Sequence, residues 1–450
     1  MKHWRIPKYV AFLTAVIFTG CTSPSDPVKE SAATPANEPI IFPKKATQSI
    51  FSLQEAADRV VAYHPRITQA LSEAKGEEEM INVAKANYYP QIKGGLGVGY
   101  DQNASGARSD NTKTVDFEIR QTLYDFGKTA SSVKRAEYGH ESAKVRSSIT
   151  QEELIHTATT TLVEAVRQKK MIELSQQQVA RVNSLVGLVD ERHNKGASNL
   201  SDLLHAQSRL NDVKSEELDA LAHYQTKLQT LKILLGAPSM LGVKLDALPK
   251  EFANSCAMPI NWEAIPEYVM ADLESKRARA DLELARAEEK PTIYVTGHSA
   301  HPLNNTDRYR SRLDSKISLN VSMPVYQGGG LSAQKRASEN YAHAAAARKE
   351  EVRLDIEQYM SDAAVRLNNM RARQSLLNDR VKNLSGTRDL YKKQYLDLGT
   401  RSLVDLLNSE QEFHRAQVDV ENNRLDIIQT ELNCAYYHGK LREFFNIAQP

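Results

Sequence analysis

The sequence predicts a mainly α-helical protein with a small membrane-inserted β component, built from two copies of one unit. Three observations lead to this fold class. Motifs recur with an offset of about 200 residues. Two proline-free segments are each long enough for a helix of roughly 100 Å. Four short segments alternate apolar and polar residues with a period of two, as strands do.

Composition and charge exclude several classes of protein. The chain has 450 residues, a formal net charge of +2 and 41% hydrophobic residues. This balance is not that of a basic nucleic-acid binder, so we expect no nucleic-acid partner. Beyond the amino terminus there is no run of about 18 apolar residues, so we expect any membrane crossing to use strands.

The amino terminus has the pattern of an export signal. Basic residues precede an apolar stretch at residues 10–18, and Gly20 then leads to Cys21. This pattern resembles a bacterial lipobox, although Phe18 stands where such boxes usually carry leucine. It implies a signal peptide at residues 1–20 and acylation of Cys21. Residues 21–49, rich in Ser, Thr, Pro and Ala, would then form a lipid-anchored flexible tether. An ordinary secretory peptide with an incidental cysteine is the alternative.

The duplication divides the chain into a first repeat at 50–250 and a second at 251–450. Pro65 and Pro90 correspond to Pro266 and Pro291. Further matched segments are 124–127 with 326–329, 133–136 with 334–337, and 196–204 with 399–407. Each repeat is predicted to contain a helix, two strands, a long helix, a tip and a returning helix. The first helices, 66–89 and 267–289, end at a proline because proline cannot continue a helical ladder.

The alternating segments form two predicted strand hairpins, at about 90–125 and about 291–326. Their apolar positions are Ile92, Leu96, Val98, Val115, Phe117, Ile119, Leu123, Ile293, Val295, Ile317, Leu319, Val321, Met323 and Val325. A half-buried soluble sheet has the same pattern. However, the rest of the chain is nearly all helical and leaves no soluble partner for the apolar face. We therefore expect strands whose apolar face contacts membrane lipid.

Closure of the membrane sheet requires several copies of the chain. An open edge leaves backbone groups unpaired in hydrocarbon, and bacterial barrels need at least about eight strands. One chain supplies four. Three copies would give about twelve strands and a lumen, and closure alone does not exclude a dimer with about eight.

Two long helix hairpins, about 127–236 and about 329–445, complete the repeats. Their first helices, about 128–194 and about 330–397, contain no proline. The returning helices carry heptad repeats at Leu221, Leu228 and Leu235, and at Leu406, Phe413, Val420, Ile427, Cys434 and Leu441. Sustained heptads indicate coiled-coil packing of helices side by side.

Together with the duplication, the segments 121–127 and 395–407 resemble the TolC-type outer-membrane efflux and secretion duct family. The resemblance covers nearly the whole mature chain. It implies a homotrimer with a twelve-stranded β-barrel in the outer membrane, continuous with a twelve-helix α-barrel in the periplasm. It further implies that a periplasmic adaptor (membrane fusion) protein docks at the tips and is fed by an inner-membrane pump.

The resemblance assigns adaptor docking to the two tips. The residues concerned are Gly196, Ala197, Ser198, Leu200, Gly399, Thr400, Arg401 and Leu403. Glycine allows the chain to reverse between helices, and Leu200 and Leu403 could fill a groove on the partner. Plain helix-hairpin turns explain the glycines equally well.

The family closes its tunnel near the inner tip with charged and polar residues. Arg388, Asp389 and Lys392 lie about two turns before Gly399 and are the gate candidates. Charges on a solvated helix face are the alternative interpretation of these three residues.

Two cysteines remain in an exported chain, where pairing is allowed. The helical rise places Cys434 about 50 Å above its tip, and the matching helix ends at about 57 Å, shortly before Cys256. A disulfide between Cys256 and Cys434 is therefore expected. A buried, inert Cys434 thiol is the alternative.

No catalytic or cofactor pattern is found. His298 and His301 lack cysteine or carboxylate support, so we assign no metal. We expect no cofactor and no enzymatic activity. The functional prediction is a passive outer-membrane exit channel of a tripartite exporter, serving type I protein secretion. Two alternatives stay open: the outer-membrane duct of a multidrug efflux pump, and, from another class, a periplasmic coiled-coil adaptor or scaffold.

Overall fold

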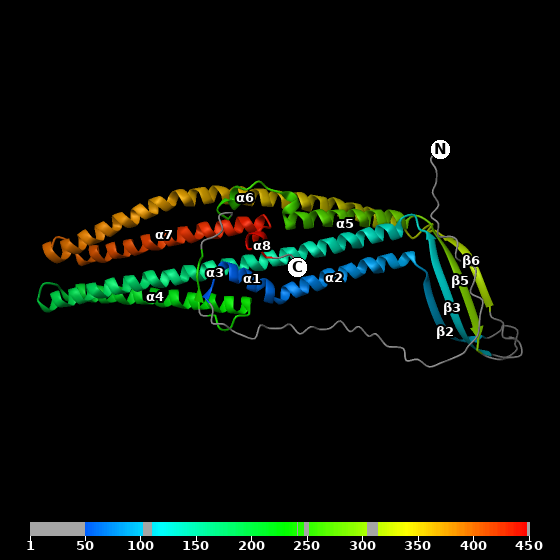
Figure 1. The fold of residues 1–450 in the computed structure, drawn as a ribbon, viewed down its shortest axis with the longest axis horizontal. Coiled ribbons are helices and arrows are strands. Elements are labelled where there is room, and N and C mark those ends of the chain that lie inside the picture. The colour runs from blue at the N-terminus through cyan, green and yellow to red at the C-terminus, as the bar shows by residue number, and fades with distance from the viewer. Residues whose placement is uncertain (1–49, 102–109, 241, 247–251, 304–313, 448–450) are drawn as a thin grey trace. The chain divides into compact units, whose positions relative to one another are not determined.

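The computed structural model describes residues 50–101, 110–240, 242–246, 252–303 and 314–447 (Figure 1). The first half contains β1 (Ile50–Phe51), α1 (Leu53–Tyr63), α2 (Pro65–Lys85), η1 (Ala86–Tyr88), β2 (Gln91–Asp101), β3 (Asp110–Tyr124), α3 (Lys128–Asn194), α4 (Leu200–Leu235) and β4 (Gly242–Val243). The second half contains η2 (Phe252–Ala257), η3 (Trp262–Ala264), α5 (Pro266–Glu288), β5 (Thr292–Pro302), β6 (Asp314–Ser322), α6 (Gly330–Lys393), η4 (Gln394–Leu398), α7 (Leu403–Tyr437) and α8 (Leu441–Phe444).

Side-chain hydrogen bonds fix where α1 and α3 begin. Ser52 accepts a hydrogen bond from the Glu55 N–H, and the Glu55 carboxylate accepts one from the Ser52 N–H at 2.8 Å, which starts α1. At the sheet-to-helix junction, the Asp125 carboxylate accepts from the Gly127 N–H at 3.0 Å and from the Thr129 N–H at 2.8 Å. These bonds satisfy N–H groups that the first turn of α3 leaves without a partner.

The four longer strands form one antiparallel sheet with the order β2-β3-β5-β6. Ile92 pairs with Ile119, which pairs with Gly297, which pairs with Ile317, so these residues share one face. Most apolar side chains of that face are exposed in the single chain, and Val115, Ile293 and Val295 are half-buried. The polar residues that alternate with them occupy the opposite face. The predicted period of two is therefore confirmed.

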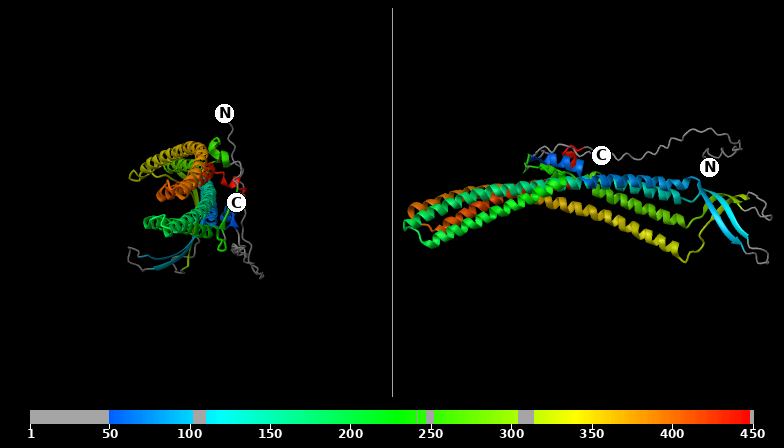
Figure 2. Two further views of the ribbon diagram at one scale, coloured as in Figure 1. Left: turned by 90° about the vertical axis from the view of Figure 1, so that its left-hand side faces the viewer. Right: turned by 90° about the horizontal axis from the view of Figure 1, so that it is seen from below.

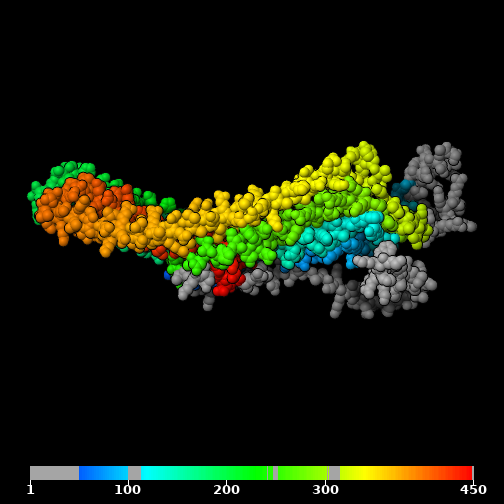
Figure 3. Space-filling model, turned by 90° about the horizontal axis from the view of Figure 1, so that it is seen from above, coloured from blue at the N-terminus to red at the C-terminus, as the bar shows by residue number. Residues whose placement is uncertain are grey.

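The long helices lie side by side, and α3 of the first half packs on α5 and α7 of the second half (Figures 1 and 2). Towards the tips, packing follows the order α4-α3-α7-α6, and towards the sheet it follows α2-α3-α5-α6. Helix α6 is thus at one edge along its whole length, and Figure 3 shows the part of it nearer the sheet as a yellow band along one margin. Among the described residues, no helix is both long enough and apolar enough to cross a membrane.

The largest core lies where the two repeats meet in the middle of the helices. Phe252 and Phe445 are buried there, against α1, α3 and the ends of α4 and α7. The Glu152 carboxylate of α3 accepts hydrogen bonds from the N–H groups of Leu441 at 2.9 Å and Arg442 at 3.1 Å. This carboxylate therefore holds the start of α8 in the core.

Several details differ from the expected helices. The first helix, expected at 66–89, ends as an α-helix at Lys85, and the 3-10 turn η1 follows it. The second long helix does not continue regularly to residue 397, because a π-helical turn, η4, replaces its last residues. The last heptad position, Leu441, lies outside α7, because α7 ends at Tyr437 and Gly439 then adopts a φ of +65°. Leu441 is nevertheless fully buried, as part of α8.

Candidate functional site at the helical tips

The first tip closes α3 with a glycine-dependent cap. Gly196 has a φ of +72°, a conformation that residues with a Cβ atom rarely adopt. Its N–H donates to the His193 carbonyl at 2.9 Å, and the Ala197 N–H donates to the Arg192 carbonyl at 2.7 Å. This pair of bonds is the Schellman arrangement, which explains the need for glycine at this position.

The second tip also reverses the chain direction at a glycine, but the helix before it ends differently. Helix α6 ends in the π-helical turn η4, and Gly399 follows with a φ of +61°. The Thr400 N–H donates to the Gln394 carbonyl at 3.1 Å, across the whole turn. The matched glycines therefore serve equivalent turns, although the helix before the second one is wider.

Both returning helices start with a side-chain cap. Asn199 accepts a hydrogen bond from the Asp202 N–H at 2.8 Å at the start of α4. Ser402 accepts one from the Asp405 N–H at 3.1 Å at the start of α7. Ser198 adds a hydrogen bond from its hydroxyl to the Asp202 carboxylate at 3.0 Å. Each aspartate also places its negative charge in the first turn of a helix, where it is stabilising.

The two tips pack on each other, although they are about 200 residues apart in the sequence (Figure 2). Arg192 donates from Nη1 to the Leu396 carbonyl at 3.2 Å, and its guanidinium carbon lies 5.0 Å from the centroid of the Tyr395 ring. The shared core consists of Leu185, Val189, Leu203, Ala206, Tyr395, Leu403, Leu406 and Leu407. The tips therefore form one unit within a protomer.

The two docking leucines have different surroundings. Leu200 is 56% exposed, as a docking side chain must be. Leu403 is only 2% exposed, because it packs into the shared tip core against Tyr395. The expectation that Leu403 could fill a groove on a partner is therefore wrong for the single chain. Leu398 and Val404, which the sequence did not single out, are the exposed apolar residues beside it.

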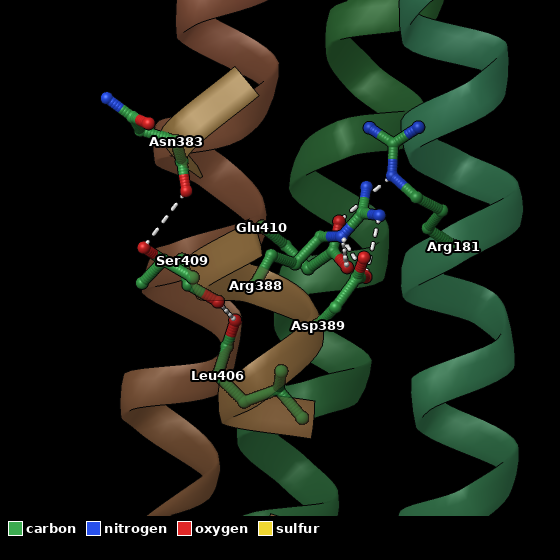
Figure 4. Close-up of polar contacts among 8 residues, drawn as sticks. Arg181, Asn383, Arg388, Asp389, Leu406, Ser409 and Glu410 are labelled. Atoms are coloured by element: carbon green, nitrogen blue, oxygen red, sulfur yellow. Dashed lines mark hydrogen bonds and ion pairs between the residues drawn. The ribbon is translucent and has the colours of Figure 1, made fainter. Parts of the chain in front are cut away.

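A buried carboxylate organises the charged residues above the tips (Figure 4). Arg181 Nε lies 2.9 Å from Glu410 Oε2, and Arg388 Nε lies 3.7 Å from Glu410 Oε1. Arg388 also donates to Asp389 at 2.8 Å. Both guanidinium groups lie over the Phe413 ring, at 5.2 Å for Arg181 and 4.4 Å for Arg388. The cluster therefore connects α3, α6 and α7.

The structure includes two of the three gate candidates in this cluster. Lys392 is exposed and forms no ion pair within the described ranges. Arg181 and Glu410, the other two residues of the cluster's ion pairs, were not predicted from the sequence. A signal for Glu410 existed: it lies seven residues after Leu403, where the heptad pattern calls for an apolar side chain.

A polar seam between α3 and α7 lies next to the cluster. His414 is 7% exposed, and its Nδ1 has no hydrogen-bond partner among the residues that the structure describes. Gln178, Arg181 and Gln417 each have a buried side-chain atom that also lacks a hydrogen-bond partner within the described ranges. Burial, followed by the positive charges of Arg181 and Arg209, lowers the pKa of His414 to about 4. The imidazole is therefore neutral at neutral pH.

The cysteines and histidines singled out from the sequence lie far from the tips along the chain. Cys256 and Cys434 form a disulfide with Cα atoms 5.1 Å apart, joining the segment between the repeats to α7. His298 and His301 are both in β5 but on opposite faces, because they are an odd number of residues apart. They cannot bind one metal ion together.

Comparison with known proteins gives a consistent assignment. Residues 56–237 and 266–439 match the family described as outer membrane efflux protein. The outer membrane protein TolC of Vibrio cholerae serotype O1 is 23% identical over 412 residues, which cover 87% of this chain and 91% of TolC. The alkaline protease secretion protein AprF of Pseudomonas aeruginosa is 23% identical, with 84% of this chain and 82% of AprF covered.

A solved structure has the same fold. The outer membrane protein VceC from Vibrio cholerae superposes with a TM-score of 0.78 at 15% identity, covering 86% of this chain and 96% of VceC. The predicted fold class, the suspected family and the outer-membrane location are confirmed. The chain belongs to the outer membrane efflux protein family.

Proposed function

We propose that three copies of this chain form a passive exit channel across the outer membrane. The open sheet edges carry this proposal. Among the described strands, β2 and β6 each pair with one neighbour, which leaves both edges of the sheet unpaired. In hydrocarbon each unpaired backbone group costs several kcal/mol. Pairing β6 of one copy with β2 of the next gives a barrel of about twelve strands without an open edge.

The helical edges support the same arrangement. Helices α4 and α2 form one edge of the protomer and α6 forms the other. Both edges expose apolar side chains: Met80, Val83, Leu204, Leu218, Leu221 and Ile233 on the first, and Tyr341, Leu354, Val365, Leu376 and Leu390 on the second. Packing α6 of one copy on α4 and α2 of the next is a head-to-tail contact, which closes into a ring. Three copies then give a tunnel of about twelve helices.

The tips are the docking surface for a periplasmic adaptor protein. Their backbone is fixed by caps, and they present Leu200, Leu398 and Val404 to solvent. An inner-membrane pump connected through the adaptor supplies the energy. The chain itself acts as a duct without enzymatic activity.

The charged cluster at Glu410 serves as the gate. Arg181 and Arg388 approach the same carboxylate from α3 and α6, so the pair holds the tip halves of both hairpins together. Opening the tunnel requires these helices to separate, and the ion pairs resist this motion.

The substrate class is secreted protein. The relative AprF is named for alkaline protease secretion, and it matches most of this chain. Multidrug efflux is the second candidate, supported by the description of the family as efflux proteins. Deleting the gene separates the two: loss of secreted proteins from the medium supports secretion, and increased drug sensitivity with unchanged secretion supports efflux.

Assembly is tested independently of the substrate. The channel should extract from outer membranes only with detergent and run as a heat-resistant trimer in mild denaturing gels. A periplasmic adaptor or scaffold, the rival from another class, would extract without detergent.

The membrane anchor is a separate part of the proposal. The signal peptide at residues 1–20, the tether at 21–49 and Cys21 lie outside the described residues. Mass spectrometry of the mature amino terminus should find an acylated Cys21. An unmodified cysteine would support the ordinary secretory peptide instead.

A further inference from the structure

A row of ionisable residues crosses the polar face of the sheet. The register pairs Lys93 of β2 with Glu118 of β3, Glu118 with His298 of β5, and His298 with Lys316 of β6. Directly paired residues point to the same face of a sheet. The apolar side chains of Ile92, Ile119 and Ile317 occupy the other face. All four strands therefore contribute one ionisable side chain at the same level.

A third cation, besides Lys93 and Lys316, lies in the next row towards the helices. Arg120 pairs with Gln91 on one side and with Thr296 on the other, so it shares the polar face. Its guanidinium carbon lies 3.9 Å from the centroid of the Tyr294 ring, which holds it against the sheet. A hollow of about 330 Å³ lies beside these residues and is lined by Asn87, Gln91, Lys93, Glu118, Arg120 and Thr122.

The charges in these two rows do not cancel. Lys93, Arg120 and Lys316 are three cations against the single carboxylate of Glu118. All three cations are exposed, and within the described part of the chain none of them forms an ion pair.

The next carboxylate on this face belongs to Asp116, one row farther from the helices than Glu118. Asp116 lies against the glycine on the neighbouring strand, because a Cβ atom at Gly95 would be only 2.6 Å from Asp116 Oδ1. We call Lys93, Glu118, Arg120, His298 and Lys316 the cationic belt.

We propose that the cationic belt is a charge-selectivity site in the barrel lumen that favours anions, including acidic segments of a passing substrate. The inference rests on the proposed function, since a trimer brings three belts to one level of a closed pore. Rings of Arg and Lys favour anions in channels, and low-dielectric walls strengthen the field of such a ring. The preference should weaken at high salt, because mobile ions screen the belt.

The test uses the full-length protein reconstituted in planar bilayers under a low-salt KCl gradient. K93Q/K316Q removes two cations and should lower the chloride-to-potassium permeability ratio at least about twofold relative to wild type. E118Q removes the carboxylate and should raise the ratio. K113Q is the matched control, because Lys113 pairs with Val98 on the apolar face of the same sheet. It should leave the ratio unchanged.

A second measurement applies a probe anion from the barrel side of the channel. Hexacyanoferrate(II), a tetravalent anion, is added to the barrel side only, and it should reduce the current through wild type and K113Q but not through K93Q/K316Q. Equal permeability ratios and equal block in all variants would overturn the belt proposal while leaving the channel intact. Failure of the wild type to form any pore would overturn the proposed function instead.

Discussion

The Arg181 guanidinium on α3 and the Glu410 carboxylate on α7 form an ion pair with an Nε to Oε2 distance of 2.9 Å. Arg388 on α6 approaches the second oxygen at 3.7 Å. The Glu410 side chain is only 6% exposed, so one carboxylate joins three helices from both repeats in a site with little solvent. Removing one charge from such a cluster leaves the others uncompensated.

We expect Glu410→Gln to open the tips. The substitution keeps the shape of the side chain but removes the charge that both arginines contact, so α6 and α7 should separate from α3 more easily. Single-channel conductance in planar bilayers should rise, and the free energy of unfolding should fall by about 3 kcal/mol. Glu412→Gln is the control, because Glu412 lies on the same helix with an exposed side chain. Equal conductance of the two variants would show that Glu410 does not hold the tips closed.

The second prediction concerns the stability of the protein at acidic pH. The pKa of His414 is lowered from 6.5 to about 4 by burial and by Arg181 and Arg209. Between these pH values the unfolded chain binds more protons than the folded one. The contribution of His414 to stability is therefore complete above pH 6.5 and is lost as the pH falls towards 4. The expected slope is at most about 1.4 kcal/mol per pH unit for each protomer.

His414→Gln should flatten this part of the profile. The measurement is the thermal unfolding temperature at several pH values between 4 and 7, in detergent at constant salt. His205→Gln serves as the control, because His205 is exposed on α4 and should leave the profile unchanged. The assignment to His414 fails if both variants keep the wild-type pH dependence.

The elements that the sequence located correctly depend on local chemistry. Pro90 and Pro291 follow shortly after the last helical residues, Tyr88 of η1 and Glu288 of α5, because proline cannot continue a helical ladder. The period-two pattern after them requires only neighbouring residues. Gly196 and Gly399 mark the tips because each adopts a positive φ. These signals act within a few residues, so a single sequence contains them.

The tip contacts could not be predicted in the same way, because they depend on both hairpins at once. Leu403 looks like the counterpart of the exposed Leu200, but the shared tip core buries it beside Tyr395. Arg388 and Asp389 were identified near the tip, whereas Arg181 lies about 200 residues earlier and meets Glu410 only in the folded chain. A repeat pattern shows equivalence between the halves but not where they touch.

The third prediction separates docking from packing at the tips. Leu200→Ala should weaken binding of the cognate adaptor and leave trimer stability unchanged, because the side chain is exposed. Leu403→Ala should lower the free energy of unfolding by about 2 to 5 kcal/mol, as expected for a buried leucine. Adaptor cross-linking and thermal unfolding are measured for both variants. A large loss of stability in Leu200→Ala, or none in Leu403→Ala, contradicts the assignment.

The last prediction concerns the Cys256–Cys434 disulfide, which closes a loop with a sequence separation of 178 residues. Cross-links that close long loops stabilise mainly by restricting the unfolded chain, typically by about 2 to 4 kcal/mol. Cys434→Ser should therefore lower the unfolding temperature, and reduction of the wild type should lower it to a similar value. Reducing agent should have no further effect on the variant, which serves as its own control.

Non-reducing mass spectrometry of the purified protein should find the two cysteines in one linked peptide, and two free thiols would rule out the cross-link. Because the disulfide lies in the middle of the helices and not at the tips, the single-channel conductance should be the same in the oxidised and the reduced channel. This result would distinguish a structural cross-link from a redox-controlled gate.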